Sequence, residues 1–231
     1  MKCLELINVS YRYEGGKSHV LQGISATFES GKVYTVIGES GAGKSTLLSL
    51  ISGLDVCREG DVYFKGVNLR DLDRDNYRAK SVGVIFQGYN LLTNSTAVYN
   101  ITLSMSISGC GGQGGGAKKK SAYAMLESVG IDHETADRKI LSLSGGEQQR
   151  VGIARALSHA PDVVIADEPT GNLDAATEAA ILGIFTRLAH EDGKCVIIVT
   201  HSENVTAIAD AVYGLRAGKL LGNQEFRTGQ Q

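Results

Sequence analysis

A glycine-rich stretch from Gly38 to Thr46 constrains the fold of this chain more than any other feature. It reads Gly-Glu-Ser-Gly-Ala-Gly-Lys-Ser-Thr and matches the phosphate-loop spacing G-x-x-x-x-G-K-[ST]. The apolar run Val33–Ile37 before it is typical of a buried strand, and leucines at helical spacing follow it as far as Gly53. A chance glycine turn would not be expected to combine strand, loop and helix in this order, so we predict a phosphate-binding site.

The residue types in this loop suit phosphate chemistry. Glycines allow tight turns that bring backbone N–H groups close to phosphate oxygens, and the start of the following helix adds the positive end of its dipole. Lys44 can neutralise the β- and γ-phosphates, and Ser45 can place its hydroxyl on Mg²⁺. We predict that a nucleotide contacts the whole loop, which consists of Gly38, Glu39, Ser40, Gly41, Ala42, Gly43, Lys44, Ser45 and Thr46.

The composition bounds the class of protein. The chain has 231 residues, long enough for one large domain or for a core with an inserted subdomain, and it is 42% hydrophobic and 21% charged, as is usual for soluble globular proteins. Its net charge of −2 gives no broad basic surface, so we expect no nucleic-acid partner. The four cysteines are scattered without a Cys-x-x-Cys pair, and no apolar run approaches the roughly 18 residues of a membrane span. We therefore expect a cytoplasmic protein that reaches a membrane only through a partner.

Further apolar runs predict the fold class. Val82–Phe86, Val163–Ala166 and Cys195–Thr200 are typical of buried strands, and helical patterns separate them. Alternating strands and helices indicate an α/β domain with a mainly parallel sheet. Short alternating stretches before residue 65 predict a small antiparallel sheet beside it; they are Leu4–Val9, Val20–Phe28 and Asp61–Phe64.

The run Gly109–Gly116 is almost entirely glycine. It predicts a flexible loop rather than a helix or a second nucleotide motif, because glycine destabilises helices and no strand precedes the run. Lys118–Lys120 are expected at the solvated start of the next helix, which Tyr123–Val129 carries.

Polar residues at the predicted strand ends form the candidate catalytic set. In a parallel sheet such positions converge beyond the carboxyl ends of the strands. Asp167 is expected to hold Mg²⁺ through water, and Glu168 to orient or deprotonate the attacking water. His201 is a candidate γ-phosphate sensor, and Gln87 can contact both Mg²⁺ and the attacking water. The alternatives are two solvated acids in a turn, a structural histidine and an ordinary glutamine.

Two further features concern the nucleotide's surroundings. Tyr13 can stack on an adenine ring, with Tyr11 as the competing candidate and ordinary strand packing as the alternative for both. Ser144-Gly145-Gly146 opens a helix and forms a second anion site, and Ser144 and Glu147 have capping-box spacing. One nucleotide does not need two such loops so far apart in sequence. We therefore expect an antiparallel, two-fold pair of chains, with each nucleotide between the phosphate loop of one and the Ser144 loop of the other.

These motifs stand in the order found in ATP-binding cassette (ABC) ATPases, which the chain resembles over essentially its whole length. In turn they resemble the Walker A loop (Gly38–Thr46), Q-loop (Gln87), signature (Leu143–Gln148), Walker B strand (Val163–Glu168), D-loop (Asn172–Asp174) and switch histidine (His201), with Tyr13 as the A-loop aromatic. The resemblance implies one ABC ATPase domain, residues 1–231. Residues 1–87 and 161–231 would form a RecA-like P-loop NTPase core with an antiparallel β-subdomain, and residues 88–160 a helical subdomain. It also implies contacts to the opposite chain's nucleotide by Ser144, Gly145, Gly146, Glu147 and Asp174.

Within this family, Gly38–Gly41, Phe86–Leu92 and Asp167–Asp174 look like the MacB/LolD branch, which includes macrolide and peptide exporters, lipoprotein-release ATPases and the cell-division ATPase FtsE. Two departures from the branch are the glycine run Gly109–Gly116 and Leu92-Thr93-Asn94, where the branch often has a proline.

The resemblance implies an ATPase subunit that uses ATP and Mg²⁺. It would form a homodimer on binding ATP, beneath a separate transmembrane permease subunit on the cytoplasmic face of the membrane, and would drive export or mechanical signalling. One alternative is a non-transport ABC ATPase with a cell-division or regulatory role, or with a soluble role in translation or DNA repair. Translation factors of this type usually carry two cassettes and repair ATPases a long coiled coil, whereas this chain has one cassette and no heptad insert. A nucleotide-binding module without turnover is another, against which Lys44, Glu168 and His201 argue.

Overall fold

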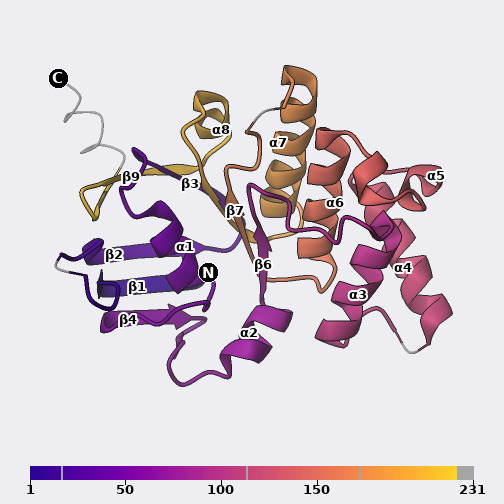
Figure 1. Cartoon of the computed structure of the whole chain (residues 1–231). Helices are drawn as coiled ribbons and strands as arrows, with labels where there is room; N and C mark the ends of the chain where they lie inside the picture. Colours follow the sequence, from indigo (N-terminus) through magenta and orange to yellow (C-terminus); the bar gives the residue numbers. More distant parts are fainter. Residues whose placement is uncertain (17, 113, 172, 223–231) are drawn as a thin grey trace.

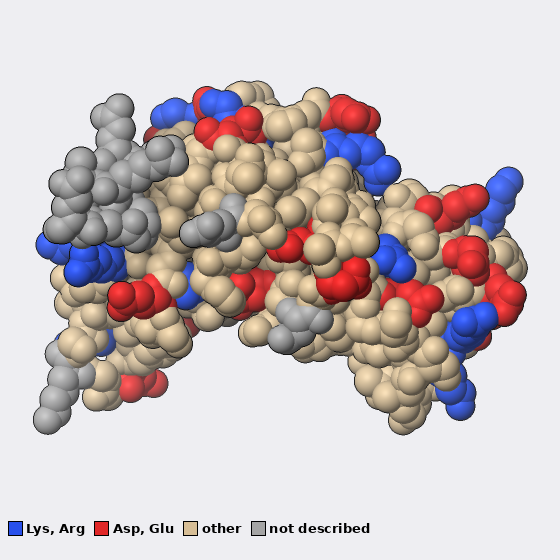
Figure 2. Space-filling model, turned by 90° about the horizontal axis from the view of Figure 1, so that it is seen from above, with Lys and Arg blue, Asp and Glu red and all other residues tan. Residues whose placement is uncertain are grey.

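The computed structural model describes residues 1–16, 18–112, 114–171 and 173–222. Figure 1 shows three parts: an antiparallel sheet, a central parallel sheet, and a lobe of helices on the opposite side from the antiparallel sheet. The space-filling view shows the helical lobe projecting to one side, with acidic and basic side chains interspersed on the visible face (Figure 2). No helix among these residues is long and apolar enough to cross a bilayer.

The central sheet has the strand order β10-β9-β3-β8-β7-β6. All neighbours in it are parallel except β10, which forms a hairpin with β9. The bounds are β3 Lys32–Ile37, β6 Val82–Ile85, β7 Val163–Asp167, β8 Cys195–Val199, β9 Ala211–Arg216 and β10 Lys219–Leu221.

The smaller sheet is antiparallel, with the order β2-β1-β4-β5. Its strands are β1 Lys2–Tyr11, β2 Leu21–Glu29, β4 Glu59–Phe64 and β5 Val67–Asn68. The helices are α1 Lys44–Ile51, α2 Arg74–Lys80, α3 Ala97–Ser108, α4 Gly115–Ser128, α5 His133–Ala136, α6 Gly145–Leu157, α7 Ala175–His190 and α8 Glu203–Ala207, with a 3₁₀ turn at Ile140–Ser142. We propose 88–160 as the helical subdomain, a range that contains α3 to α6.

The central strands separate two hydrophobic cores. Neighbouring residues of a strand point to opposite faces, so Val196 and Ile198 of β8 pack with α6 and α7, whereas Ile197 and Val199 pack with α1 and the antiparallel sheet. All four side chains have an exposed fraction of 0%. Burial on both faces explains why these strands are continuous apolar runs in the sequence.

The structure corrects the prediction for the glycine run. Helix α4 begins at Gly115, so the last two glycines, Gly115 and Gly116, are helical rather than part of a loop. The chain reverses before them at Gly109 and Gly111, which have φ angles of 74° and 87°. Gln113 of the run lies outside the described residues. Packing of Leu126 against the other helices, with an exposed fraction of 0%, outweighs the low helix propensity of these glycines.

Candidate active site

Four parallel strands bring the predicted catalytic residues to one edge of the sheet. The phosphate loop follows β3, His201 follows β8, Asp167 and Glu168 end and follow β7, and Gln87 follows β6. Because these strands are adjacent in the order β3-β8-β7-β6, segments far apart in sequence converge. The backbone joins two of them directly, since the N–H of Glu168 donates to the carbonyl of Val199 at 2.8 Å.

The phosphate loop has the backbone that its glycines predict. Gly43, at the start of α1, has a φ angle of 106°, in the region that glycine favours. At position 38 a glycine is required for a different reason: a Cβ there would lie 2.3 Å from the carbonyl oxygen of Leu215, which leaves no room for a side chain. The Lys44 ammonium lies against the loop, donating to the carbonyls of Gly38 at 2.7 Å and Glu39 at 3.0 Å. The one cation of the loop is thus centred where phosphate oxygens would be bound.

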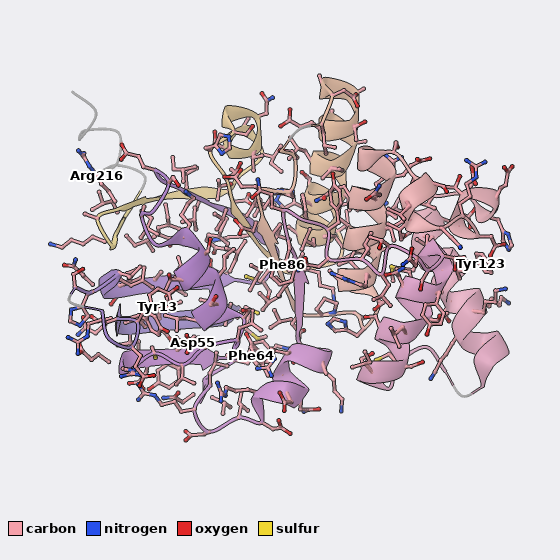
Figure 3. All side chains as sticks on the ribbon, viewed as in Figure 1. Tyr13, Asp55, Phe64, Phe86, Tyr123 and Arg216 are labelled. Carbon is pink, nitrogen blue, oxygen red and sulfur yellow. The ribbon has the colours of Figure 1, made fainter. Side chains whose placement is uncertain are left out.

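The structure separates the two tyrosine candidates. Tyr11 is buried, with an exposed fraction of 7%, and its hydroxyl donates to Asp55, whose carboxylate raises the Tyr11 pKa to about 12. Tyr13 is 52% exposed, and its hydroxyl lies 2.9 Å from Oγ1 of Thr46, the last residue of the phosphate loop. Figure 3 places Tyr13 beside α1 and the antiparallel sheet. Its ring meets that of Tyr11 edge-on, with the ring centroids 5.1 Å apart, and is the more exposed of the two, so Tyr13 remains the candidate for stacking on an adenine.

Glu168 occupies a strained position between two neighbouring side chains. Its φ angle is 47°, which is uncommon outside glycine and frequent at functional sites. Thr200 donates its hydroxyl to Oε2 at 3.0 Å, and His201 Nδ1 lies 2.8 Å from Oε1. The Glu168 side chain is only 13% exposed and that of His201 is 79% exposed. The carboxylate is thus fixed in direction, while the imidazole faces outward.

Sequence reasoning missed Thr200. It is fully buried, with an exposed fraction of 0%, and besides Glu168 it accepts a hydrogen bond from the N–H of Ser202 at 3.0 Å. The available signal was a polar residue at the end of an apolar strand, directly before a candidate histidine.

Asp167 is half-buried at the end of β7. Partial burial raises its pKa above the usual value, and the neighbouring charge of Glu168 adds to the shift, while Lys44 opposes it. Because these surroundings disfavour the ionised form, a bound cation would stabilise the Asp167 carboxylate.

The donor set fits Mg²⁺. Ser45 Oγ, the Asp167 carboxylate and the Gln87 amide offer oxygen ligands, which this ion prefers together with waters and phosphates. Gln87 is exposed, and a Cβ on Gly171 would lie 4.0 Å from its Nε2, which places the side chain near the loop after β7. Across the described ranges, no group of three His, Cys, Asp or Glu side chains forms a protein-only metal cage.

The Ser144 loop forms the predicted capping box at the start of α6. Ser144 accepts a hydrogen bond from the Glu147 N–H at 3.3 Å, and its own N–H donates to Glu147 Oε2 at 2.7 Å. The Ser144 hydroxyl also donates to Glu147 Oε2 at 2.7 Å, and this bond, together with the one from the Ser144 N–H, lowers the pKa of the Glu147 carboxyl. Among the described contacts, Gly145 borders Tyr89 and Gly146 borders Thr177 of α7, and none joins this loop to the phosphate loop of the same chain.

Asp174 caps the neighbouring helix α7. Its carboxylate accepts from the N–H groups of Ala176 at 3.1 Å and Thr177 at 3.0 Å, and hydrogen bonding to Thr177 lowers its pKa. Asp174 thus has a structural role besides the predicted contact across a dimer. Asn172, which precedes it in the predicted D-loop, lies outside the described residues.

Comparison with known proteins identifies the family. Residues 21–171 match the family model described as "ABC transporter". The chain belongs to the ABC transporter family. Related ABC sequences include an uncharacterized ATP-binding protein of Bacillus subtilis, YclH, 42% identical over 94% of this chain and 95% of YclH. The macrolide export ATP-binding/permease protein MacB of Chlorobium phaeobacteroides is 39% identical over 96% of this chain but only 34% of MacB.

A solved ABC structure agrees with the fold. The ATP-binding cassette MJ0796, in a dimeric post-hydrolysis state bound to ADP and Pi, superposes with a TM-score of 0.87 at 34% identity, over 95% of this chain and 98% of that one. MJ0796 of Methanocaldococcus jannaschii is itself 35% identical over 97% of both chains. The predicted P-loop NTPase fold, ABC ATP-binding subunit and MacB-like branch are confirmed, and the chain is an ABC cassette of the ATPase class.

Proposed function

We propose that this ABC cassette hydrolyses ATP as a homodimer and passes the resulting motion to a separate membrane permease subunit. The observation that carries the proposal is the Glu168 carboxylate, held between Thr200 and His201 at the edge of the sheet that also presents the phosphate loop. A binding module without turnover would not need a fixed carboxylate at this point.

The geometry supports separate roles for the two acids. Glu168 has both carboxylate oxygens oriented by neighbours, so it can accept a proton from a water that attacks the γ-phosphate. Burial and the charge of Glu168 disfavour an unpaired negative charge on Asp167 and raise its pKa, so a bound cation would stabilise the Asp167 carboxylate. When bound, Mg²⁺ would be held by Ser45, Asp167 and Gln87 and would neutralise charge on the phosphates.

Lys44 and His201 would complete the phosphate site. Lys44 is already oriented by two loop carbonyls and would exchange these for phosphate oxygens, which attract its charge more strongly. His201 is exposed and linked to Glu168, a position from which it can sense the γ-phosphate and orient the base. Tyr13 would stack on the adenine.

The dimer would supply the other half of the site. Within the described part of one chain, no hydrogen bond joins the Ser144 loop to the phosphate loop. The start of α6 offers N–H groups and the positive end of the helix dipole, which suit a phosphate presented by a second chain. Residues Ser144, Gly145, Gly146, Glu147 and Asp174 would lie at that contact. The MJ0796 cassette, which is similar to this chain, has been solved as a dimer.

The membrane partner would dock between α2, α3 and the end of α6. A cavity of about 320 Å³ opens there, and a second of about 230 Å³ adjoins it. Arg78, Arg155 and His159 line both cavities, and Leu92 and Ile107 expose apolar surface at the first. This surface fits a cytoplasmic segment of the permease that carries apolar side chains and an acidic group.

The decisive experiment replaces Glu168. Glu168→Gln keeps the shape of the side chain but removes the charge and the basic lone pair, so single-turnover hydrolysis should fall by about 10²–10⁴. ATP binding should be retained, and an ATP-bound dimer should accumulate because the variant cannot hydrolyse ATP and so cannot dissociate. Glu191→Gln, at the exposed end of α7, is the matched control. Hydrolysis by Glu168→Gln at the wild-type rate would show that Glu168 is not the base.

A further inference from the structure

The segment directly after Gln87 has an unusual backbone. Tyr89 and Asn90 are consecutive residues with φ angles of 58° and 51°. Asparagine tolerates this left-handed region, but a tyrosine there is uncommon and requires support from its surroundings. The turn itself gives some, because the N–H of Tyr89 donates to the Phe86 carbonyl at 3.1 Å. Figure 3 places Phe86, where the segment leaves the core, at the centre of the molecule.

Arg155 supports both strained residues. From the last turn of α6, its guanidinium donates to the Tyr89 carbonyl at 3.3 Å and also to the Asn90 carbonyl. Burial lowers the pKa of this guanidinium. Among the described residues, no carboxylate forms an ion pair with it. Arg155 is half-buried beside the cavities described above, and its hydrogen bonds to the two carbonyls hold the left-handed turn at Tyr89 and Asn90 against α6.

Tyr89 also reaches the other end of α6. A Cβ on Gly145, the first residue of α6, would lie 3.4 Å from the Tyr89 hydroxyl oxygen. A Cβ on Gly152, two turns further along, would lie 3.7 Å from the Tyr89 carbonyl oxygen. Tyr89 therefore lies along α6 from the Ser144 loop toward Arg155.

We propose that Tyr89 and Arg155 are positioning residues that bind residues 89–90 to α6, so that this segment and the Ser144 loop move as one unit. The inference rests on the proposed function, in which Gln87 contacts the nucleotide of its own chain and the Ser144 loop contacts that of the partner. Gln87 lies on the core side, near Gly171, so the pivot falls at Gln87–Gly88. A movement of Gln87 on nucleotide binding would thus also move the Ser144 loop, which is the surface offered to the second chain.

The test uses amide hydrogen exchange of the full chain as a monomer, with and without ATP, at concentrations below dimer formation. In the wild type, ATP should change exchange both at residues 86–88 and at residues 144–148. In Arg155→Lys, and more weakly in Tyr89→Phe, the change at 86–88 should persist while that at 144–148 falls to less than about half. A lysine cannot reproduce the forked guanidinium contact, and phenylalanine lacks the hydroxyl beside Gly145.

Matched controls remove the same groups elsewhere. Arg187→Lys alters a guanidinium that donates to the Ser128 carbonyl at 3.1 Å, and Tyr99→Phe removes the hydroxyl of an exposed ring on α3. Neither should alter the response at residues 144–148. ATP affinity and the melting temperature are measured on every variant, because a merely structural role would change these instead of the transmitted response.

A second measurement concerns dimer formation in the Glu168→Gln background. Adding Arg155→Lys should raise the dimer dissociation constant by about 10-fold, the effect of one hydrogen bond to a charged donor, at similar ATP affinity. A full ATP response at 144–148 in both Arg155→Lys and Tyr89→Phe would overturn the inference. Failure of Glu168→Gln alone to dimerise would overturn the proposed dimer instead, and the exchange experiment on monomers would still decide the role of Tyr89 and Arg155.

Discussion

Lys44 shows how one residue can dominate a binding site. Its ammonium is held by two backbone carbonyls and is the cation at the centre of the loop. Lys44→Ala should weaken ATP binding by about 10²-fold or more, because hydrogen bonds to charged groups contribute roughly 1.5–3 kcal/mol each. Equilibrium titration with labelled ATP measures this, with Lys120→Ala on the exposed surface of α4 as the control. Unchanged affinity would contradict the assignment of the loop.

Asp167 illustrates a conflict between function and stability within one residue. Asp167→Asn should weaken Mg²⁺-dependent ATP binding, because it removes the charged ligand. The same change should stabilise the nucleotide-free protein at neutral pH, since a partly buried charge next to Glu168 disappears. We expect a rise in melting temperature of roughly 2–4 °C, the shift that about 1 kcal/mol produces in a domain of this size.

The pH dependence follows from the direction of the Asp167 shift. A carboxyl whose pKa is raised by folding stabilises the folded state most at low pH, and this contribution is lost as pH rises through its range. The difference in melting temperature between Asp167→Asn and the wild type should therefore grow from pH 4 toward neutrality. A difference that is constant or shrinks with rising pH would contradict the proposed environment.

At the scale of elements, Asp210 ties three segments together at the opposite end of the sheet. Its carboxylate accepts from the Val33 N–H of β3 at 2.7 Å and lies 2.9 Å from Nε2 of His190 at the end of α7. Partial burial opposes ionisation, but the hydrogen bonds of His190 and Val33 outweigh it and lower the Asp210 pKa. Asp210 is also the residue directly before β9, so its side chain links β3, α7 and the start of β9.

Asp210→Asn tests this junction. A carboxyl with a lowered pKa contributes stability above its unfolded pKa of about 3.9, and this contribution is lost as pH falls through the folded value. The wild type should therefore melt at a higher temperature than Asp210→Asn at pH 7, and the gap should close below about pH 4. Thermal unfolding followed by circular dichroism measures both. A gap that persists in acid would mean that the carboxylate charge is not responsible.

The elements differ in how far the sequence predicts them. The central strands were predictable because both their faces are buried, which forces continuous apolar runs such as Cys195–Val199. Helix α2 was not predicted, since among its residues only Tyr77 is buried and its start depends on a single cap, Asp73. The start of α4 at Gly115 was mispredicted because packing, rather than propensity, decides it.

The residues of the candidate site also differ in how far the sequence predicts them. Residues at strand ends, such as Gln87 and His201, could be found because the topology of a parallel sheet brings them together. Thr200 and Tyr89 could not, since their roles depend on side-chain contacts between segments distant in the sequence. The residues alone left Tyr11 and Tyr13 open and only the family resemblance favoured Tyr13, whereas the contact that occupies Tyr11, with Asp55, is created by the fold.

At the scale of the whole molecule, the groove by α3 should decide partner binding. Ile107 is 74% exposed and lines the larger cavity together with Leu92 and Arg155. Ile107→Glu should reduce association with membranes that contain the permease by about 10-fold or more, because it places a charge in an apolar contact. Co-sedimentation with such membranes measures the effect, with Ile7→Glu on the exposed side of β1 as the control. Equal loss in both variants would contradict this docking site.

The division of the interior by the central sheet limits how the length of this chain can change. Inserting one residue within β8 would exchange the neighbours of Val196 and Ile197, which belong to different cores, and would misplace every following side chain of that strand. Such an insertion damages two packed regions at once. Length variation is therefore tolerable only in connections such as that between α3 and α4, where Gly109 has nothing within 4 Å of a Cβ placed on it.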